Sequence, residues 1–137
     1  AADKRAVLAA RSDGVIKSLT LVKGGKVSAG DVVMTLEGPE TEAQEKIAEI
    51  ALAQKDSDLE RAERLFAGGN VPEIEVTNAR SAREAAAAEL ARAQAEVDKQ
   101  RLTAPFDGIF DTLDVEIGEW VQTGTPVATI LSLDPIV

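Results

Sequence analysis

"APFDGIFDTLDVEIGEWVQTGTPVATI", residues 104–130, repeats most of a pattern that has already occurred once in the chain. Residues 13–36 read "DGVIKSLTLVKGGKVSAGDVVMTL" and align without gaps with residues 107–130. The identical pairs in this alignment are Asp13/Asp107, Gly14/Gly108, Leu19/Leu113, Gly24/Gly118, Val27/Val121, Gly30/Gly124, Val33/Val127 and Thr35/Thr129. Glycines and aliphatic residues kept in register over this length indicate two copies of one structural unit.

Each copy has the composition of short strands separated by glycine turns. In the first copy, aliphatic and β-branched runs predict strands at residues 15–16, 19–21 and 32–36 and around Val27. Glycine adopts a positive φ without a Cβ clash, so the glycines are expected at turns. These glycines are Gly14, Gly24, Gly30, Gly108, Gly118 and Gly124. A unit of about thirty residues cannot close a core alone, and the copies are therefore predicted to pack as one quasi-symmetric β sandwich.

Between the two copies, the chain has the composition of two long helices. Residues 41–66 and 73–102 are rich in Ala, Glu, Gln, Lys, Arg and Leu and contain no internal Gly or Pro. Apolar and alanine positions recur every three or four residues in both segments, which indicates a packing seam. Only residues 67–72 separate the segments, so we expect an antiparallel coiled-coil hairpin with its tip at these residues.

The ends of the helical segments carry typical start and stop signals. Thr41 and Gln44 fit a capping box, and the pair Gly68-Gly69 offers the left-handed residue that commonly ends a helix. Pro72 suits the first turn of the second helix. The predicted fold class is α+β, with residues 1–40 and 104–137 as the halves of the sandwich and residues 41–103 as the inserted hairpin.

Composition excludes several classes of function. The chain has 15 basic and 24 acidic residues, for a net charge of −9, which repels phosphate backbones, so nucleic-acid binding is not expected. It contains no histidine and no cysteine, which supply most general bases, thiolate nucleophiles and zinc ligands. We therefore expect no enzyme, no metal site and no bound cofactor.

The order of these parts resembles a known family. The segments "GVIKSLTLVKGGKVSAGDVVMTLEGPE" and "RLTAPFDGIFDTLDVEIGEWVQTGTPVATILSLDPIV", with the helical pair between them, resemble the HlyD-like membrane fusion proteins. These are the periplasmic adaptors of resistance-nodulation-division tripartite efflux pumps. The resemblance implies a biotinyl/lipoyl-like barrel-sandwich hybrid split by the hairpin. It also implies that "LDPIV", residues 133–137, leads toward a β-barrel domain that has no counterpart in this sequence.

The same resemblance implies partners and a docking site. Adaptors of this kind link an inner-membrane transporter, through domains missing here, to a TolC-like outer-membrane channel, through the hairpin tip. They act as homo-oligomers, as a hexamer or a trimer of dimers, in the periplasm and anchored to the inner membrane. The family's tip pattern Arg-x-x-x-Leu-x6-Ser matches Arg61 and Leu65, whereas Pro72 stands at the serine position. Gly68 and Gly69 complete the expected docking tip.

Two other readings of the sequence remain open. One is an adaptor of an ABC-type or type I secretion exporter, since the domains that would distinguish the transporter classes are absent from the sequence. The other is a lipoyl or biotin carrier, which shares the repeated sandwich. Such a carrier needs a lysine at an exposed turn between its halves, and here the helices occupy that connection. Lys23 and Lys26 flank a glycine turn, without a Met-Lys-Met or Asp-Lys-Ala context.

Overall fold

The computed structural model describes residues 4–20 and 22–132, and it divides into two compact units. One unit combines Ala1–Gly38 with Asp98–Val137, and the other is Pro39–Val97. The first contains the strands and the second contains both long helices, which confirms the α+β class. The helical unit is therefore a single insertion between two chain segments that fold together.

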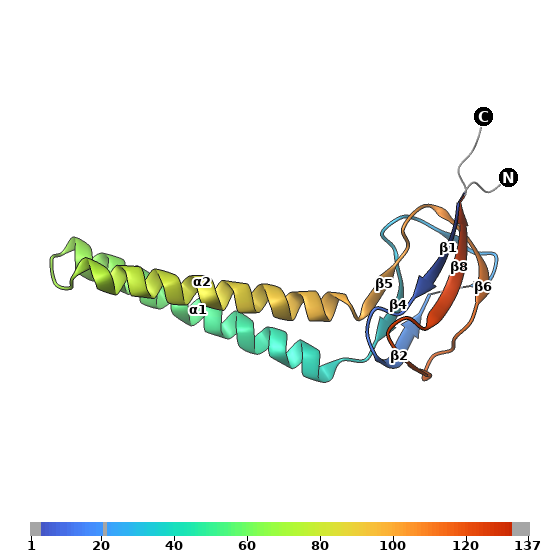
Figure 1. Cartoon of the computed structure of the whole chain (residues 1–137), viewed down its shortest axis with the longest axis horizontal. Coiled ribbons are helices and arrows are strands. Elements are labelled where there is room, and N and C mark those ends of the chain that lie inside the picture. Colours follow the sequence, from blue (N-terminus) through green and yellow to red (C-terminus); the bar gives the residue numbers. More distant parts are fainter. Residues whose placement is uncertain (1–3, 21, 133–137) are drawn as a thin grey trace, which may run out of the picture. The chain divides into compact units, whose positions relative to one another are not determined.

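Two four-stranded sheets form the first unit, and each combines strands from both sides of the insertion (Figure 1). The strands are β1 Arg5–Ala9, β2 Gly14–Leu19, β3 Lys26–Val27, β4 Val32–Leu36, β5 Arg101–Thr103, β6 Gly108–Leu113, β7 Trp120–Val121 and β8 Pro126–Ser132. Their order is β1-β8-β6-β3 in one sheet and β5-β4-β2-β7 in the other, with antiparallel neighbours. β2 ends at Leu19, whereas a strand was predicted at residues 19–21. Leu21 and residues 133–137 lie outside the described residues.

One hydrophobic core joins the two halves of the sandwich. Its largest fully buried side chains are Ile16, Val33 and Met34 from the first half and Val121, Val127 and Ile130 from the second. Each of them is at most 1% exposed. Because full burial of such a side chain stabilises a fold by about 1.5–3 kcal/mol, neither half can be removed without exposing the core of the other.

Reciprocal hydrogen bonds explain why the Asp-Gly pair is written twice. The carboxylate of Asp13 accepts from the backbone N–H of Thr123 at 2.7 Å and from its hydroxyl at 3.0 Å. The carboxylate of Asp107 accepts from the backbone N–H of Ala29 at 2.8 Å. Ala29 and Thr123 are aligned in the repeat, as Asp13 and Asp107 are. Each copy therefore holds a turn of the other, and the Thr123 bonds lower the pKa of Asp13.

The quasi-symmetry extends further along the chain than the alignment from Asp13. At the same offset, β1 corresponds to β5, and both are outer strands, paired with the corresponding strands β8 and β4. Neither strand was predicted from the sequence. Leu8 and Leu102, and likewise Ala10 and Ala104, are identical at this offset and could have revealed them.

The glycines of the repeat divide into two groups. Gly24, Gly30, Gly118 and Gly124 have φ between 82° and 92°, where only glycine is unstrained. Gly14 and Gly108 are not turn residues, because they are the first residues of β2 and β6. Gly108 is needed for a different reason: a Cβ there would overlap the carbonyl oxygen of Leu131 on the neighbouring strand β8.

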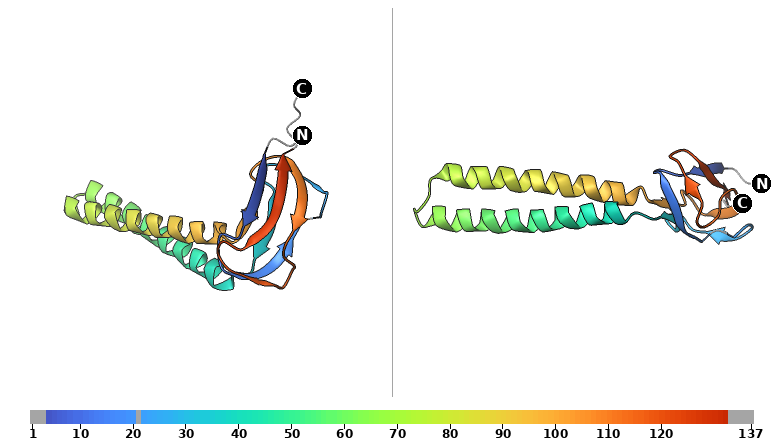
Figure 2. Two further views of the ribbon diagram at one scale, coloured as in Figure 1. Left: turned by 45° about the vertical axis from the view of Figure 1, so that its right-hand side comes forward. Right: turned by 90° about the horizontal axis from the view of Figure 1, so that it is seen from below.

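The second unit consists of α1, Pro39–Ala67, and α2, Glu73–Asp98, which run antiparallel and side by side (Figures 1 and 2). The first helix begins at Pro39 rather than Thr41, so Thr41 lies in the first turn and not at the capping position. The second ends at Asp98, four residues before the expected Leu102. There the N–H of Leu36 donates to the carbonyl of Gln100, and residues 101–103 pair with β4, so sheet pairing overrides helix propensity.

Small side chains fill the seam between α1 and α2. Its buried residues are Ala48 on α1 and Val76, Ala93 and Val97 on α2. Phe66, one residue before the end of α1, is 43% exposed. Within residues 4–20 and 22–132, neither helix has an apolar stretch long enough to cross a membrane.

Candidate functional site

A well-defined turn closes the hairpin tip. The N–H of Asn70 donates to the carbonyl of Leu65 at 2.8 Å, and the N–H of Gly69 donates to that of Phe66 at 2.9 Å. Together with the φ of 74° at Gly69, these bonds form a Schellman motif. Of the two tip glycines, only Gly69 is left-handed. Gly68 instead continues the helical pattern, with its N–H donating to Arg64 at 3.1 Å.

Pro72 lies immediately before α2 rather than in its first turn. Its carbonyl accepts from the N–H of Glu75 at 3.0 Å, so the proline occupies the capping position and offers no side-chain oxygen to the first N–H groups. Glu73 and Glu75 lie in the first turn, where carboxylates interact favourably with the positive end of the helix dipole.

Arg61 and Leu65 come together at a groove between the helices near the tip. The groove has a volume of about 350 Å³ and is lined by Lys55, Asp58, Arg61, Ala62 and Leu65 on α1 and by Val71, Glu75, Asn78, Ala79 and Ala82 on the following segment. The guanidinium of Arg61 lies 3.0 Å from the carboxylate of Asp58, one turn earlier, yet its side chain stays 63% exposed. A partner could therefore reach a cation and an apolar side chain at the same place.

Two exposed apolar residues at the tip were missed as docking candidates. Phe66 is 43% exposed and follows Leu65, which is 39% exposed, near the end of α1. Ile74 is 57% exposed and lies near the start of α2, after the turn. In a Schellman motif, the residue at the position of Leu65 usually packs on an apolar residue at the position of Asn70. Asn70 is polar, so Leu65 lacks that partner. The exposure of Ile74 could have been predicted from the sequence, because residues two apart on a helix point to different faces and Val76 is at the packed face.

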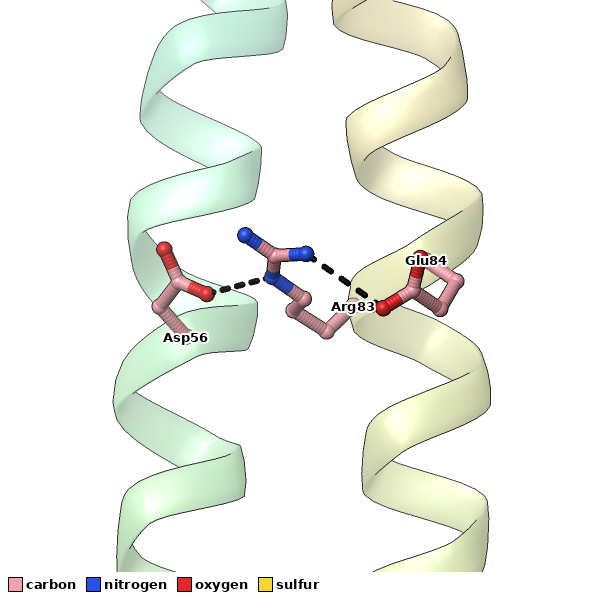
Figure 3. A network of polar contacts seen from close by, with 3 residues as sticks. All are labelled: Asp56, Arg83 and Glu84. Atoms are coloured by element: carbon pink, nitrogen blue, oxygen red, sulfur yellow. Dashed lines mark hydrogen bonds and ion pairs between the residues drawn. The ribbon is translucent and has the colours of Figure 1, made fainter.

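Ion pairs between the helices hold this end of the hairpin in register. The Nε of Arg83 on α2 lies 2.7 Å from the carboxylate of Asp56 on α1, and the same guanidinium contacts Glu84 at 3.3 Å (Figure 3). The hydrogen bond and charge of Asp56 raise the pKa of Arg83. Closer to the tip, Arg80 and Glu63 are 3.9 Å apart. Opposite positions on the two helices are thus linked by charge as well as by the alanine seam.

The tip brings polar and apolar groups together. It presents a guanidinium, three exposed apolar side chains and backbone groups fixed by the turn. Among the residues that the structure describes, no three Asp or Glu side chains gather as a metal ion would require.

Comparisons with known proteins agree with this architecture, although the chain matches no protein-family model. It is 29% identical over 142 residues to the multidrug resistance protein MdtA of Klebsiella pneumoniae, covering 92% of this chain and 34% of MdtA. It is 38% identical over 93 residues to the nickel-cobalt-cadmium resistance protein NccB of Alcaligenes xylosoxydans, covering 64% of this chain and 23% of NccB. The chain thus spans about a third of the length of MdtA and about a quarter of the length of NccB.

A solved structure shows the same combination of sandwich and hairpin. It is a MacA–MexA chimeric protein that contains the α-hairpin domain of Pseudomonas aeruginosa MexA, and it superposes with a TM-score of 0.90 at 23% identity. The match covers 96% of this chain and 47% of the chimeric chain. In sequence and in fold, the chain is therefore similar to the membrane fusion proteins, the adaptor proteins of efflux systems.

Proposed function

We propose that this chain is the sandwich-and-hairpin part of a periplasmic adaptor that links an inner-membrane efflux transporter to an outer-membrane channel. The observation that carries the proposal is the helical pair inserted between the two halves of one sandwich, an arrangement shared with the MacA–MexA chimera at a TM-score of 0.90. The relatives MdtA and NccB, both named as resistance proteins, agree with export as the activity.

The finer parts of the proposal follow the sequence resemblance. The helices wind around each other as a coiled coil, and the residues 1–40, 41–103 and 104–137 act as half-sandwich, hairpin and half-sandwich. Several copies, as a hexamer or a trimer of dimers, surround the path of the exported compound in the periplasm. The transporter is of the resistance-nodulation-division class, and the full-length protein is anchored to the inner membrane through parts beyond these residues.

In this role, the hairpin tip docks onto the channel. Arg61 donates hydrogen bonds to backbone carbonyls at the ends of channel helices, and Leu65 is covered by the same contact. Gly69 gives the tight turn that exposes both side chains, and Gly68 leaves room beside the turn for a close approach. Phe66 and Ile74 widen the apolar contact. Pro72 takes the place of a hydroxyl that would otherwise cap α2, so the docking relies on the arginine and the apolar residues.

Substitutions at the tip test this function in the full-length protein expressed at its native level. Arg61→Asp or Leu65→Ser should abolish efflux-dependent resistance, because losing an interface anchor typically costs about 2 kcal/mol or more in binding. Matched controls are Arg92→Asp and Ile47→Ser. Both are exposed helix positions away from the tip, with Arg92 paired to Glu89 and Ile47 59% exposed. The controls should retain resistance, and immunoblots should show equal abundance for all four variants.

Other outcomes would reject parts of the proposal. Normal export by both tip variants, or crosslinks from the channel to the sandwich instead of the tip, would overturn the docking site. Copurification with an ABC-type transporter would replace the transporter class by the alternative adaptor role. An increase in intact mass by a lipoyl or biotinyl group would replace the adaptor reading by that of a carrier domain.

A further inference from the structure

Two turns of the sandwich have the same backbone and opposite chemistry. The basic turn is residues 22–26, and the acidic turn is residues 116–120, its counterpart in the repeat. In the basic turn, the N–H of Gly25 donates to the carbonyl of Val22 at 2.7 Å. In the acidic turn, the N–H of Glu119 donates to that of Glu116 at 3.1 Å. The repeat has therefore conserved the shape of the turn in both halves.

The side chains on the two turns differ at every position except the glycine. The basic turn carries Val22, Lys23, Gly25 and Lys26 where the acidic turn carries Glu116, Ile117, Glu119 and Trp120. Ile117 is 64% exposed, Trp120 60% and Val22 68%, so each turn offers apolar surface to solvent beside its charges. Trp120 is the single tryptophan of the chain. Aromatic side chains such as that of Trp120 are enriched at protein contact surfaces.

The neighbouring strands reverse their charge in the same way. Gly24 donates to the carbonyl of Phe110, which precedes Asp111, and Gly118 donates to the carbonyl of Ile16, which precedes Lys17. The basic turn with Asp111 thus carries one net positive charge, and the acidic turn with Lys17 carries one net negative charge. Glu119 also accepts from the N–H of Glu116 at 3.2 Å. The two surfaces are therefore complementary in charge. The complementarity includes Asp111 beside the basic turn and Lys17 beside the acidic turn.

The two turns lie at the edges of different sheets. The basic turn leads into β3, an edge strand of the sheet β1-β8-β6-β3, and the acidic turn leads into β7, an edge strand of the sheet β5-β4-β2-β7. The two surfaces therefore belong to different sheets. Two copies can bring them into contact, and each copy then still has one unused surface of each kind.

We propose that copies of this chain associate head to tail, with the acidic turn of one copy against the basic turn of the next. Lys23 and Lys26 meet Glu116 and Glu119, and a lysine ammonium lies over the ring of Trp120 as a cation–π contact. Ile117 and Val22 are covered in the same contact. A heterologous contact of this type builds a ring when its rotation closes and an open chain when it does not.

This inference rests on the homo-oligomeric part of the proposed function, and it specifies the surfaces that make the oligomer. One turn from each copy buries less than the roughly 1,200 Å² of a stable interface. The association of the 137-residue chain should therefore be weak, and it is best detected by trapping.

Disulfide trapping tests the pairing directly, because the chain has no cysteine of its own. Val22→Cys and Ile117→Cys are made as two separate single variants, which keep all the charges of both turns, and are purified and mixed in equal amounts under mild oxidation. The expected product is the mixed disulfide between position 22 of one copy and position 117 of the other, in excess over both homodimers together. A pair placed on the hairpin, Glu49→Cys with Glu84→Cys, serves as the control for random collision.

Charge reversal then tests the chemistry of the contact. On the cysteine backgrounds, changing Lys26→Glu with Glu116 and Glu119 intact should lower the mixed disulfide about tenfold, as loss of a complementary charge pair does. Changing Glu116→Lys and Glu119→Lys with Lys26 intact should lower it similarly. The mixed disulfide should return when the Lys26→Glu chain with the cysteine at position 22 is mixed with the Glu116→Lys/Glu119→Lys chain with the cysteine at position 117.

The alternatives are separable from each other and from the adaptor proposal. Predominance of the 117–117 homodimer would overturn the inference in favour of a symmetric contact between acidic turns. A mixed disulfide no more abundant than in the hairpin control, or insensitive to the charge reversals, would also overturn it. Neither result involves a channel or a transporter, so the tip variants would still decide the proposed function independently.

Discussion

The sandwich and the hairpin of this protein bury very different side chains. The sandwich encloses Ile16, Met34 and Ile130 almost completely, whereas the largest buried residues in the hairpin are Val76 and Val97. Burial free energy grows with the apolar area removed from water. Core packing therefore stabilises the sandwich, while the hairpin depends more on helix propensity, alanine contacts and ion pairs between its helices.

Because of this difference, the two regions differ in which apolar side chains they can leave exposed. A hairpin with a narrow seam leaves most of its surface polar and accessible, and its tip can expose Leu65, Phe66 and Ile74 without opening a core. The sandwich has little such freedom, because two sheets from both halves of the chain share one set of buried residues. Its exposed residues lie at turns such as those at Lys23 and Ile117 and at strand positions such as Val7.

The largest effect should come from a cavity in the sandwich core. Ile130→Ala removes a side chain that is fully buried, and such a change typically costs about 2–5 kcal/mol of unfolding free energy. The same substitution at Ile47, 59% exposed on α1, should change stability by less than about 0.5 kcal/mol. Urea unfolding of both variants measures the contrast. Equal destabilisation would show that the hairpin relies on apolar packing as much as the sandwich does.

A smaller effect is expected from the ion pair between the helices. Arg83→Met keeps the aliphatic length but leaves Asp56 without its partner on the other helix, so amide exchange near both residues should accelerate while exchange in the sandwich stays unchanged. Arg92→Met is the matched control, since its partner Glu89 lies on the same helix. Added salt should shrink the difference between Arg83→Met and the natural chain. An identical exchange pattern in both variants would mean that the alanine seam alone aligns the helices.

The smallest effect concerns the reciprocal bonds between the halves of the sandwich. The hydrogen bonds from Thr123 lower the pKa of Asp13 in the folded chain, so its carboxylate stabilises the fold above the ordinary aspartate pKa. That contribution is lost as the pH falls through the lowered pKa. Asp13→Asn should therefore be less stable than the natural chain near neutral pH, and the two should converge in acid. Unfolding curves at both pH values check the sign, and a gap that persists in acid would contradict it.

The predictability of this protein from its sequence also differs between the two regions. The helices were anticipated because Ala, Glu and Arg favour helix locally and the seam repeats every three or four residues. The repeat indicated that the two halves share one sandwich, since the identities between Asp13 and Ile130 keep their register. The tip residues Arg61 and Leu65 were identified by resemblance and do line one groove, whereas the exposure of Phe66 and Ile74 was not foreseen.

The class of fold was predictable from the sequence, as were the insertion of two helices into a repeated β unit and the left-handed turns at Gly30 and Gly124. These features depend on local preference and on self-similarity. The end of α2 depends on tertiary structure, because residues 101–103 pair with β4 as a strand although helix was predicted as far as Leu102. Tertiary structure also explains why Asp13 and Asp107 occur in both copies, because their hydrogen-bond partners lie 110 and 78 residues away along the chain. Contacts between segments so distant in sequence leave no local pattern from which they could be predicted.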